Sequence, residues 1–300
     1  MTGATTPASV RVDPELAGQT VVVIGGSSGI GMETARRAGQ EGAGVIITGR
    51  HADRLKQAAA DVGARDTAAF DATDPAALSG FFRNLPGPVD HVLVTGPGPY
   101  YAPLAELDRD RAHLDYDHHI WLPVAVAQQA VGRVRPGGTL LFMSGTGGRS
   151  RGPGLSIMGA ITAALPALVA NLAVEIAPIR VNLVAAGFVD TPLSASLLGA
   201  DLDKRRAQLR ATLPIRRVVG PADIAALAVH LMINTAVTGA TYDIDGGEQL
   251  VPGALRGAGS AGRHHHRRLQ GHRRGPGGRV PRARLGGGGD CPQDQAVGSR

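Results

Sequence analysis

The sequence contains very little cysteine, lysine and aromatic side chain. Cys291 is the single cysteine of the 300 residues, and Lys56 and Lys204 are the two lysines. Aromatic residues make up only 3% of the chain. An intrachain disulfide needs two cysteines and a cysteine metal cluster needs several, so both are excluded, and we predict no metal site.

Long apolar runs are also missing. The most apolar stretch, residues 161–179, is interrupted by Pro166, Asn171, Glu175 and Pro178, so we expect no membrane span. The first twenty residues have no apolar segment after a basic start, which a secretory signal would need. These features predict a cytoplasmic protein.

The positive charge is confined to the end of the chain. The formal net charge is +6, but residues 253–300 alone hold ten arginines and two acidic residues. Those residues therefore carry +8, and residues 1–252 carry −2. A nearly neutral body excludes an assignment of the whole chain as a nucleic-acid-binding domain.

We predict that residues 253–300 form a disordered Gly/Arg-rich tail. This segment contains thirteen glycines and no aromatic residue, so it cannot bury enough apolar surface to offset its ordering entropy. An inert, solvated extension is favoured over a basic arm that binds nucleic acid, because the tail has no aromatic stacking platform. Residues 1–18, which are small and polar, are predicted to form a flexible N-terminal arm.

Between these ends, residues 19–252 are predicted to form one domain. Short apolar runs typical of buried parallel strands occupy residues 21–24, 45–48, 67–70, 91–95, 139–143, 179–184 and 241–244. Segments with helical spacing occupy residues 30–41, 52–62, 75–85, 106–134, 155–177 and 222–233. This alternation predicts an α/β fold with a doubly wound, Rossmann-like parallel sheet flanked by helices on both faces.

A glycine-rich loop follows the first predicted strand and opens the first helix. It contains Gly25, Gly26, Ser27, Ser28, Gly29, Ile30 and Gly31. Glycines permit a tight turn and a close approach of backbone to a pyrophosphate, and the helix N-terminus presents free N–H groups to it. The loop is therefore a candidate phosphate site of a dinucleotide.

Arg50 and Asp71 follow the second and third predicted strands. The residue at the end of the second strand meets the adenosine ribose in dinucleotide sites, where an acid favours NAD(H). Arg50 would bind a 2′-phosphate, which favours NADP(H) over NAD(H). The alternative is a solvated surface arginine. Asp71, followed by Ala72, is a candidate acceptor for the adenine amino group, or else a helix cap beside Asp74.

At this point the chain resembles the short-chain dehydrogenase/reductase family, in its single-domain branch. The resemblance covers roughly residues 19–251 and rests on six motifs in order. These are the glycine loop, Asp71, Gly137-Gly138-Thr139-Leu140 leading to Ser144, residues 175–182, Gly187-Phe188-Val189-Asp190-Thr191-Pro192, and Asp243-Ile244-Asp245-Gly246-Gly247. The resemblance implies that Thr95 and Gly96 pass the adenosine ribose, and that the segment from Val189 to Thr191 contacts the nicotinamide carboxamide. It also implies a homodimer or homotetramer.

The catalytic positions of the family are all changed. Its members use a Tyr and a Lys one helical turn apart, a Ser and an Asn. In this sequence the Tyr position holds Met158, the Lys position Thr162, the Ser position Gly145 and the Asn position His119. Residues 149–179 contain neither tyrosine nor lysine, so no small shift of the alignment restores the pair. The chain is thus a divergent member of the family it resembles.

Four residues are candidates to replace the missing groups. Tyr100 and Tyr101 follow the fourth predicted strand, His119 titrates near neutral pH, and Ser144 lies one residue before the Ser position. Each also has an ordinary structural interpretation, as loop packing or as a helix surface.

Three functions stay open. The first is an NADP(H)-dependent oxidoreductase that acts on a small carbonyl or alcohol with an unusual proton donor. The second is a non-catalytic NADP(H)-binding protein, a sensor or partner subunit. The third is non-redox chemistry on the same fold. Residues 194–213 are expected to cover the substrate, with residues 202–206 forming a solvated helix face.

Overall fold

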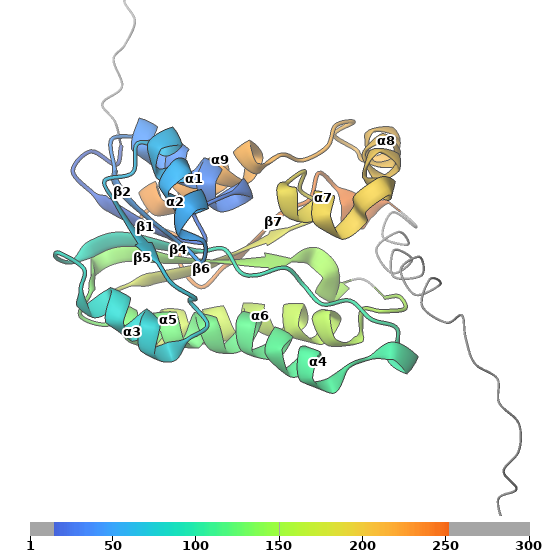
Figure 1. Ribbon diagram of the computed structural model, residues 1–300, viewed down its shortest axis with the longest axis horizontal. Helices are drawn as coiled ribbons and strands as arrows, with labels where there is room; N and C mark the ends of the chain where they lie inside the picture. The colour runs from blue at the N-terminus through green and yellow to red at the C-terminus, as the bar shows by residue number, and fades with distance from the viewer. Residues whose placement is uncertain (1–14, 150, 252–300) are drawn as a thin grey trace, which may run out of the picture. The chain divides into compact units, whose positions relative to one another are not determined.

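The computed structural model describes residues 15–149 and 151–251. The predicted tail 253–300 and most of the predicted arm lie outside the described residues. Figure 1 shows a three-layer arrangement with one sheet between two layers of helices. This confirms the predicted α/β fold.

The sheet has seven parallel strands in the order β3-β2-β1-β4-β5-β6-β7. Their bounds are β1 Thr20–Ile24, β2 Gly44–Gly49, β3 Asp66–Ala69, β4 Val89–Val94, β5 Val134–Gly145, β6 Arg180–Ala186 and β7 Thr241–Ile244. The apolar runs predicted from the sequence overlap these strands. The inner strands β1, β4 and β6 are mostly buried because helices cover both faces, whereas the edge strands β3 and β7 contain no buried residue. Since all strands run the same way, the loops after β1, β4 and β6 emerge at one edge of the sheet.

Nine α-helices flank the sheet in the described part of the chain. They are α1 Gly29–Gln40, α2 Ala52–Val62, α3 Pro75–Arg83, α4 Arg109–Tyr116, α5 Leu122–Ala130, α6 Ser156–Glu175, α7 Pro192–Leu198, α8 Leu202–Thr212 and α9 Pro221–Ile233. Helices α1, α2 and α9 cover one face, and α3, α4, α5 and α6 lie on the other (Figure 1). Two apolar cores fill the spaces between the sheet and these helix layers.

Leu16 corrects the predicted extent of the N-terminal arm. Its side chain is fully buried in the core under α1 and α9, and its backbone N–H donates to the carbonyl of Glu41. Residues 15–18 therefore belong to the folded domain rather than to a flexible arm.

The single helix predicted over residues 106–134 is wrong. The structure has α4, then a π-helical turn over Asp117–Trp121, then α5, and β5 begins at Val134. Pro123 explains the break. It has no N–H to donate to the carbonyl of His119, so the chain widens and the Leu122 N–H donates to the carbonyl of Asp117, five residues back. This turn carries His118 and His119.

Helix α6 bears on the expectation that the chain has no membrane span. By length and composition alone it is long and apolar enough to cross a membrane, although the interruptions in its sequence predict otherwise. Its buried side chains, among them Met158, Ile161 and Leu165, pack into the core against β5 and β6. The same composition is therefore explained by packing on the sheet, and cytoplasmic location stays a prediction.

Candidate nucleotide and proton-transfer site

The glycine loop after β1 leaves no room for side chains. A Cβ atom at Gly25, whose φ is +89°, would lie 2.2 Å from Thr95 Oγ1, and one at Gly31 would lie 2.3 Å from the carbonyl oxygen of Gly25. The cap residue Ser28 makes no side-chain cap bond, and the first turn of α1 holds no acidic residue. The N–H groups of that turn, including Ile30, are therefore available to an anion, and the loop fits a dinucleotide phosphate.

Thr95 ties the end of β4 to this loop. Its hydroxyl lies 3.1 Å from the carbonyl oxygens of both Ile24 and Gly25. Its backbone N–H also donates to the carbonyl of Ile24. Thr95 and Gly96 thus lie beside the candidate phosphate loop, where the family resemblance places the adenosine ribose.

Arg50, Ala72 and Asp71 lie at the ends of the neighbouring strands. Arg50 is exposed directly after β2. Asp71 accepts hydrogen bonds from the backbone N–H and the hydroxyl of Thr73. The Thr73 N–H lowers the pKa of Asp71, and the positive charges of Arg50 and His118 lower it further. Asp74, and not Asp71, caps α3 through the N–H groups of Ala76 and Ala77, which removes the cap as the explanation for Asp71.

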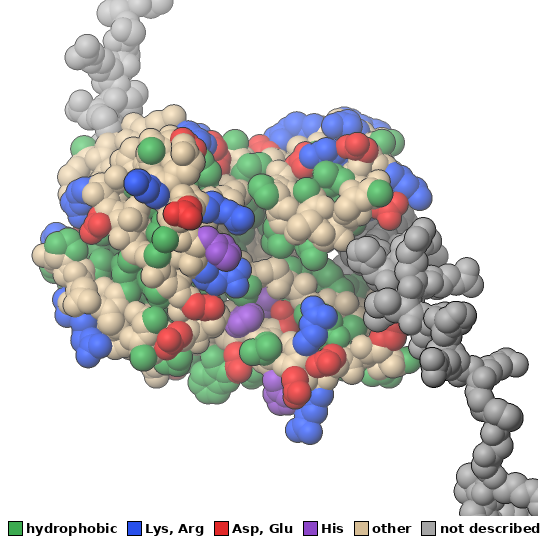
Figure 2. Space-filling view, in the orientation of Figure 1, with side chains coloured by type: hydrophobic (Ala, Val, Ile, Leu, Met, Phe, Trp, Pro, Cys, Tyr) green, Lys and Arg blue, Asp and Glu red, His purple; other side chains and the backbone are tan. Residues whose placement is uncertain are grey.

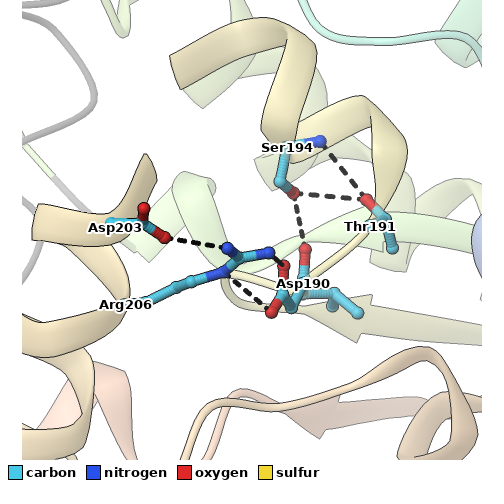
Figure 3. A network of polar contacts seen from close by, with 6 residues as sticks. Asp190, Thr191, Ser194, Asp203 and Arg206 are labelled. Atoms are coloured by element: carbon cyan, nitrogen blue, oxygen red, sulfur yellow. Dashed lines mark hydrogen bonds and ion pairs between the residues drawn. The ribbon is translucent and has the colours of Figure 1, made fainter. Parts of the chain in front are cut away.

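The segment from Val189 to Thr191 is held by a network of polar contacts at the start of α7 (Figure 3). Thr191 caps α7 by accepting from the Ser194 N–H, and the Ser194 hydroxyl donates to the carbonyl of Val189. Gly29 of the glycine loop faces Thr191, since a Cβ atom there would lie 3.5 Å from the Thr191 Cβ. The loops after β1 and β6 therefore meet, as a cofactor that spans them requires.

Two arginines of α8 fasten that helix to the body. Arg206 binds both carboxylate oxygens of Asp190, at 3.0 and 2.7 Å (Figure 3). Arg205 pairs with the buried Glu248 and lies 6.0 Å over the ring of Phe188. The prediction that residues 202–206 form a solvated face is therefore wrong for these two arginines. Their positive charges compensate those of Asp190, after β6, and Glu248, after β7.

Glu248 is a site residue that the sequence analysis missed. Its side chain is 2% exposed, and its second carboxylate oxygen accepts from the Phe188 N–H at 3.0 Å. Burial raises the pKa of Glu248, and this N–H and Arg205 oppose the rise. The available signal was its place directly after Gly246 and Gly247, at the end of the last family motif.

The positions predicted to correspond to the family's Tyr and Lys carry no acid or base. Met158 and Thr162 are buried on α6, and the Thr162 hydroxyl donates back to the carbonyl of Met158 at 2.7 Å. Thr162, Gly145 and Ser144 line a cavity of about 220 Å³. Its lining contains no ionisable side chain: Ser144, Gly145, Thr146, Gly148, Thr162, Ala163, Pro166, Leu183, Ala185 and Thr241. A proton donor must come from elsewhere.

The two tyrosines after β4 have different surroundings. The Tyr100 hydroxyl accepts from the Asp108 N–H at 3.0 Å, and Arg111 lies 4.4 Å over its ring. These contacts fix the Tyr100 ring in the loop, and its role in proton transfer stays a prediction. Desolvation of the Tyr101 phenol, together with the charges of Asp115 and Glu248, raises its pKa. A raised pKa makes Tyr101 harder to ionise, the reverse of what the family achieves with its lysine.

His119 is the candidate with a charged partner. Its Nδ1 lies 2.8 Å from the carbonyl oxygen and 3.3 Å from Oδ1 of Asp115, one turn earlier. Burial lowers the pKa of His119, but the contacts with Asp115 outweigh it, and the net shift is upward. The other end of the ring faces the loop after β4, where a Cβ atom at Gly96 would lie 3.9 Å from Nε2. Figure 2 shows basic and histidine side chains gathered between the two helix layers on this side of the molecule.

No group of three or more His, Cys, Asp or Glu side chains suited to a metal ion occurs within residues 15–149 and 151–251. The three adjacent histidines at 264–266 lie outside the described residues.

Fold and loops together define a doubly wound α/β protein of the dinucleotide-binding class. A family model described as enoyl-(acyl carrier protein) reductase matches residues 24–249. The chain therefore belongs to the short-chain dehydrogenase/reductase family, and its fold is the one that binds nicotinamide cofactors in that family.

Individual relatives are similar over most of their length. A short-chain dehydrogenase/reductase named ATR9 from Stachybotrys chlorohalonatus is 28% identical over 259 residues, covering 79% of this chain and 99% of the relative. An NADP-dependent (R)-specific alcohol dehydrogenase from Lentilactobacillus kefiri is 30% identical, covering 77% and 97%. Among solved structures, a small-chain dehydrogenase in complex with NADPH has a TM-score of 0.66 at 27% identity, covering 77% and 99%.

The pair of Arg205 and Glu248 gives a stability prediction that depends on pH. Replacing Arg205 with Met leaves a buried carboxylate without its cation, so we expect a loss of about 3–5 kcal/mol of unfolding free energy at pH 8. A raised pKa favours the protonated, neutral Glu248 in the folded state, which needs no cation. The loss should therefore be smaller near pH 5 and grow as the pH rises. Urea unfolding at both pH values measures it.

The matched control is Arg210→Met, an exposed arginine on the same helix, for which we expect a change within about 0.5 kcal/mol at both pH values. Equal losses for Arg205→Met at pH 5 and pH 8 would contradict the assignment of a buried, titrating partner.

Proposed function

We propose that the protein is an NADP(H)-dependent oxidoreductase that acts on a small carbonyl or alcohol, with His119 as its proton donor. The observation that carries the proposal is the position of His119. Its ring joins a buried carboxylate at one end and the Gly96 loop at the other, beside the glycine loop. The relatives above are named as dehydrogenases or reductases, which supports the reaction class.

Several residues would hold the cofactor. The N–H groups at the start of α1 would bind the pyrophosphate, Arg50 the 2′-phosphate, Asp71 the adenine amino group, and the segment from Val189 to Thr191 the carboxamide. When bound, the nicotinamide supplies or accepts a hydride. An NADP-dependent relative and a solved NADPH complex support NADP(H) over NAD(H).

His119 would supply the proton. As the carbonyl carbon accepts a hydride, the π electrons move to the oxygen, and that oxygen takes the proton from Nε2. The ring is left neutral and regains a proton from water. Because the pKa of His119 is raised, the ring keeps its proton nearer to neutral pH than a free histidine does. Ser144 would orient the substrate oxygen, since within residues 15–149 and 151–251 its hydroxyl donates only over a long 3.5 Å contact, to the carbonyl of Gly145.

A non-catalytic cofactor-binding protein is the second candidate function. The observation that favours it is that neither residue at the predicted positions of the catalytic pair is ionisable, with Met158 buried and Thr162 bonded to its own helix. Such a protein would bind NADPH and reduce no carbonyl. The two functions therefore differ in turnover and not in cofactor affinity.

The cofactor assignment is tested with Arg50→Asp. Loss of a charge-assisted bond to the 2′-phosphate should raise the Kd for NADPH about 10- to 100-fold, and the Kd for NADH should stay unchanged or fall, since an acid at this position favours NAD(H). Trp121, the single tryptophan of the chain, is 57% exposed beside the histidine turn and serves as the fluorescence probe. Arg54→Asp, an exposed change on α2, should leave both constants unchanged. An equal effect of Arg50→Asp on the two cofactors would refute the preference.

The proton donor is tested with His119→Gln. NADPH oxidation is followed against a panel of ketones, quinones and enones. For any accepted substrate, kcat should fall about 10²- to 10⁴-fold, since one acid–base group is lost, while the Kd for NADPH stays constant. His113→Gln, exposed on α4, is the control. A wild-type protein that binds NADPH and oxidises it with no member of the panel would favour the non-catalytic function.

The pH dependence of kcat in the wild-type protein is a further test of His119 as the proton donor. In reduction the reacting form is the imidazolium, so kcat should be high at low pH and fall as the pH rises through the raised pKa of His119. A profile that rises with pH in this range would argue against His119 as the acid.

We also propose that the chain forms a homodimer or homotetramer. The outer face of α6 exposes Ala160, Ala163, Ala164, Ala167 and Ala170, and Val174 is 78% exposed. These small apolar side chains suit close helix packing against a second copy. Helices α4 and α5, on the same face of the sheet as α6, would contribute to this contact as two separate helices.

Light scattering after size-exclusion chromatography tests this assembly. Val174→Asp should reduce the mass of the wild-type oligomer because it places a charge in the apolar contact. Ala60→Asp, an exposed change on α2 at the opposite face of the sheet, is the control. A monomeric wild-type protein would refute the assembly. An oligomer unaffected by Val174→Asp would show that its interface lies on a face other than α6.

A further inference from the structure

Asp115 is a buried carboxylate whose contacts are few and well defined. Its side chain is 3% exposed. Oδ1 accepts from the Tyr100 N–H at 3.2 Å and lies 3.3 Å from His119 Nδ1. Oδ2 is buried and has no hydrogen-bond partner within residues 15–149 and 151–251. One backbone N–H does not compensate a buried negative charge, so His119 is the group placed to do so.

The surroundings of Nδ1 decide which nitrogen of His119 carries a proton. Nδ1 faces two acceptors from the same residue, the backbone carbonyl and Oδ1 of Asp115. Neither of these atoms can donate, so Nδ1 must hold a hydrogen. In the neutral ring, Nε2 is then the nitrogen with the free electron pair. Proton exchange with a substrate therefore occurs at Nε2, the atom that faces Gly96.

The backbone around His119 explains how this geometry arises. Asp115 is in the last turn of α4, and His119 is four residues later, within the π-helical turn. Residues four apart on a helix lie on one face. The Tyr100 N–H comes from the loop after β4. The carboxylate therefore links the helix to the loop that the ring faces.

The charges around His119 come from few residues. Asp115 on α4 acts on it most strongly, and the loop after β4 contributes the carbonyl of Pro97. The charge of Asp115 also raises the pKa of Tyr101, which lies in the same loop. His118, on the same turn as His119, lowers the pKa of Asp71 instead. Asp115 is the single acid among the groups that shift His119.

We propose that Asp115 is a positioning residue, which holds His119 with a proton on Nδ1 and stabilises its imidazolium so that Nε2 delivers the proton. The proposal rests on the proposed function for the reaction itself. The pairing of Asp115 and His119 is a property of the chain that can be measured without a substrate.

The test uses NMR of the imidazole nitrogens in the full chain. The His119 signals are assigned as those that disappear in His119→Gln. In the wild-type protein we expect the neutral ring to be the Nδ1–H tautomer and the pKa to lie above 6.5. In Asp115→Asn the pKa should fall by about 1–3 units, because the opposite charge within about 4 Å is lost. Asp117→Asn, an exposed acid in the same π-helical turn, should leave the pKa of His119 in place.

Kinetics give the second readout where a substrate has been found. The fall of kcat with rising pH should move to lower pH in Asp115→Asn by the same amount as the pKa, with the Kd for NADPH unchanged. A role limited to folding would lower the yield or stability and not move this profile.

The outcomes separate the two proposals. An Nε2–H tautomer in the wild-type protein, or an unchanged pKa of His119 in Asp115→Asn, overturns the role of Asp115 whether or not the protein turns over. The expected tautomer and pKa shift in a protein that oxidises no NADPH support the pairing and count against the proposed function. If Asp115→Asn does not fold, the wild-type measurements decide the role of Asp115 alone: an Nδ1–H tautomer with a raised pKa of His119 supports it, and an Nε2–H tautomer overturns it.

Discussion

The pairing of β4 with β1 places the two central loops of the candidate site side by side. The sheet order places β4 beside β1, although β2 and β3 come between them in the chain. Because all strands are parallel, the loops that follow β1 and β4 leave the same edge side by side. Thr95 then reaches the carbonyls of Ile24 and Gly25. Gly25 has to be glycine, since a side chain there would collide with Thr95.

The substrate side depends on a second constraint, the closure of α7 and α8 over the same edge. Each of the two arginines of α8 meets an acid that is fixed elsewhere, Asp190 after β6 and Glu248 after β7. Both contacts end beside the segment that would meet the nicotinamide. The stability of that segment is thus coupled to the charge state of Glu248. Helix α8 is thus held to the body by specific ion pairs and not by apolar packing alone.

The sequence predicted the fold because buried parallel strands are short apolar runs that the eye can find, such as residues 21–24 and 91–95. It also predicted the glycine loop, because the steric limits that require glycine there act between residues close in sequence, such as Gly25 and Gly31. The pairing of Arg205 with Glu248 could not be predicted, since 43 residues separate them. Arginine and glutamate are also residue types that usually lie at the protein surface. Asp115 was missed for another reason. The spacing of residues 106–134 indicated one regular helix, and the effect of Pro123 on the turn before it was not recognised. The four-residue separation of Asp115 from His119 was the available signal.

The proposed mechanism solves the same physical problem as the family's usual residues, from the opposite direction. A tyrosine begins with a pKa near 10 and needs a neighbouring positive charge to bring it toward neutral pH. A histidine begins near 6.5, and burial would lower it further, so it needs a negative charge. Replacing the tyrosine by a histidine therefore removes the need for the lysine and creates a need for a carboxylate. Thr162 and Asp115 agree with this expectation, since one has no charge and bonds to its own helix while the other is buried against the ring. In the proposed mechanism, the change of proton donor from tyrosine to histidine therefore requires the change of its charged neighbour from lysine to a carboxylate.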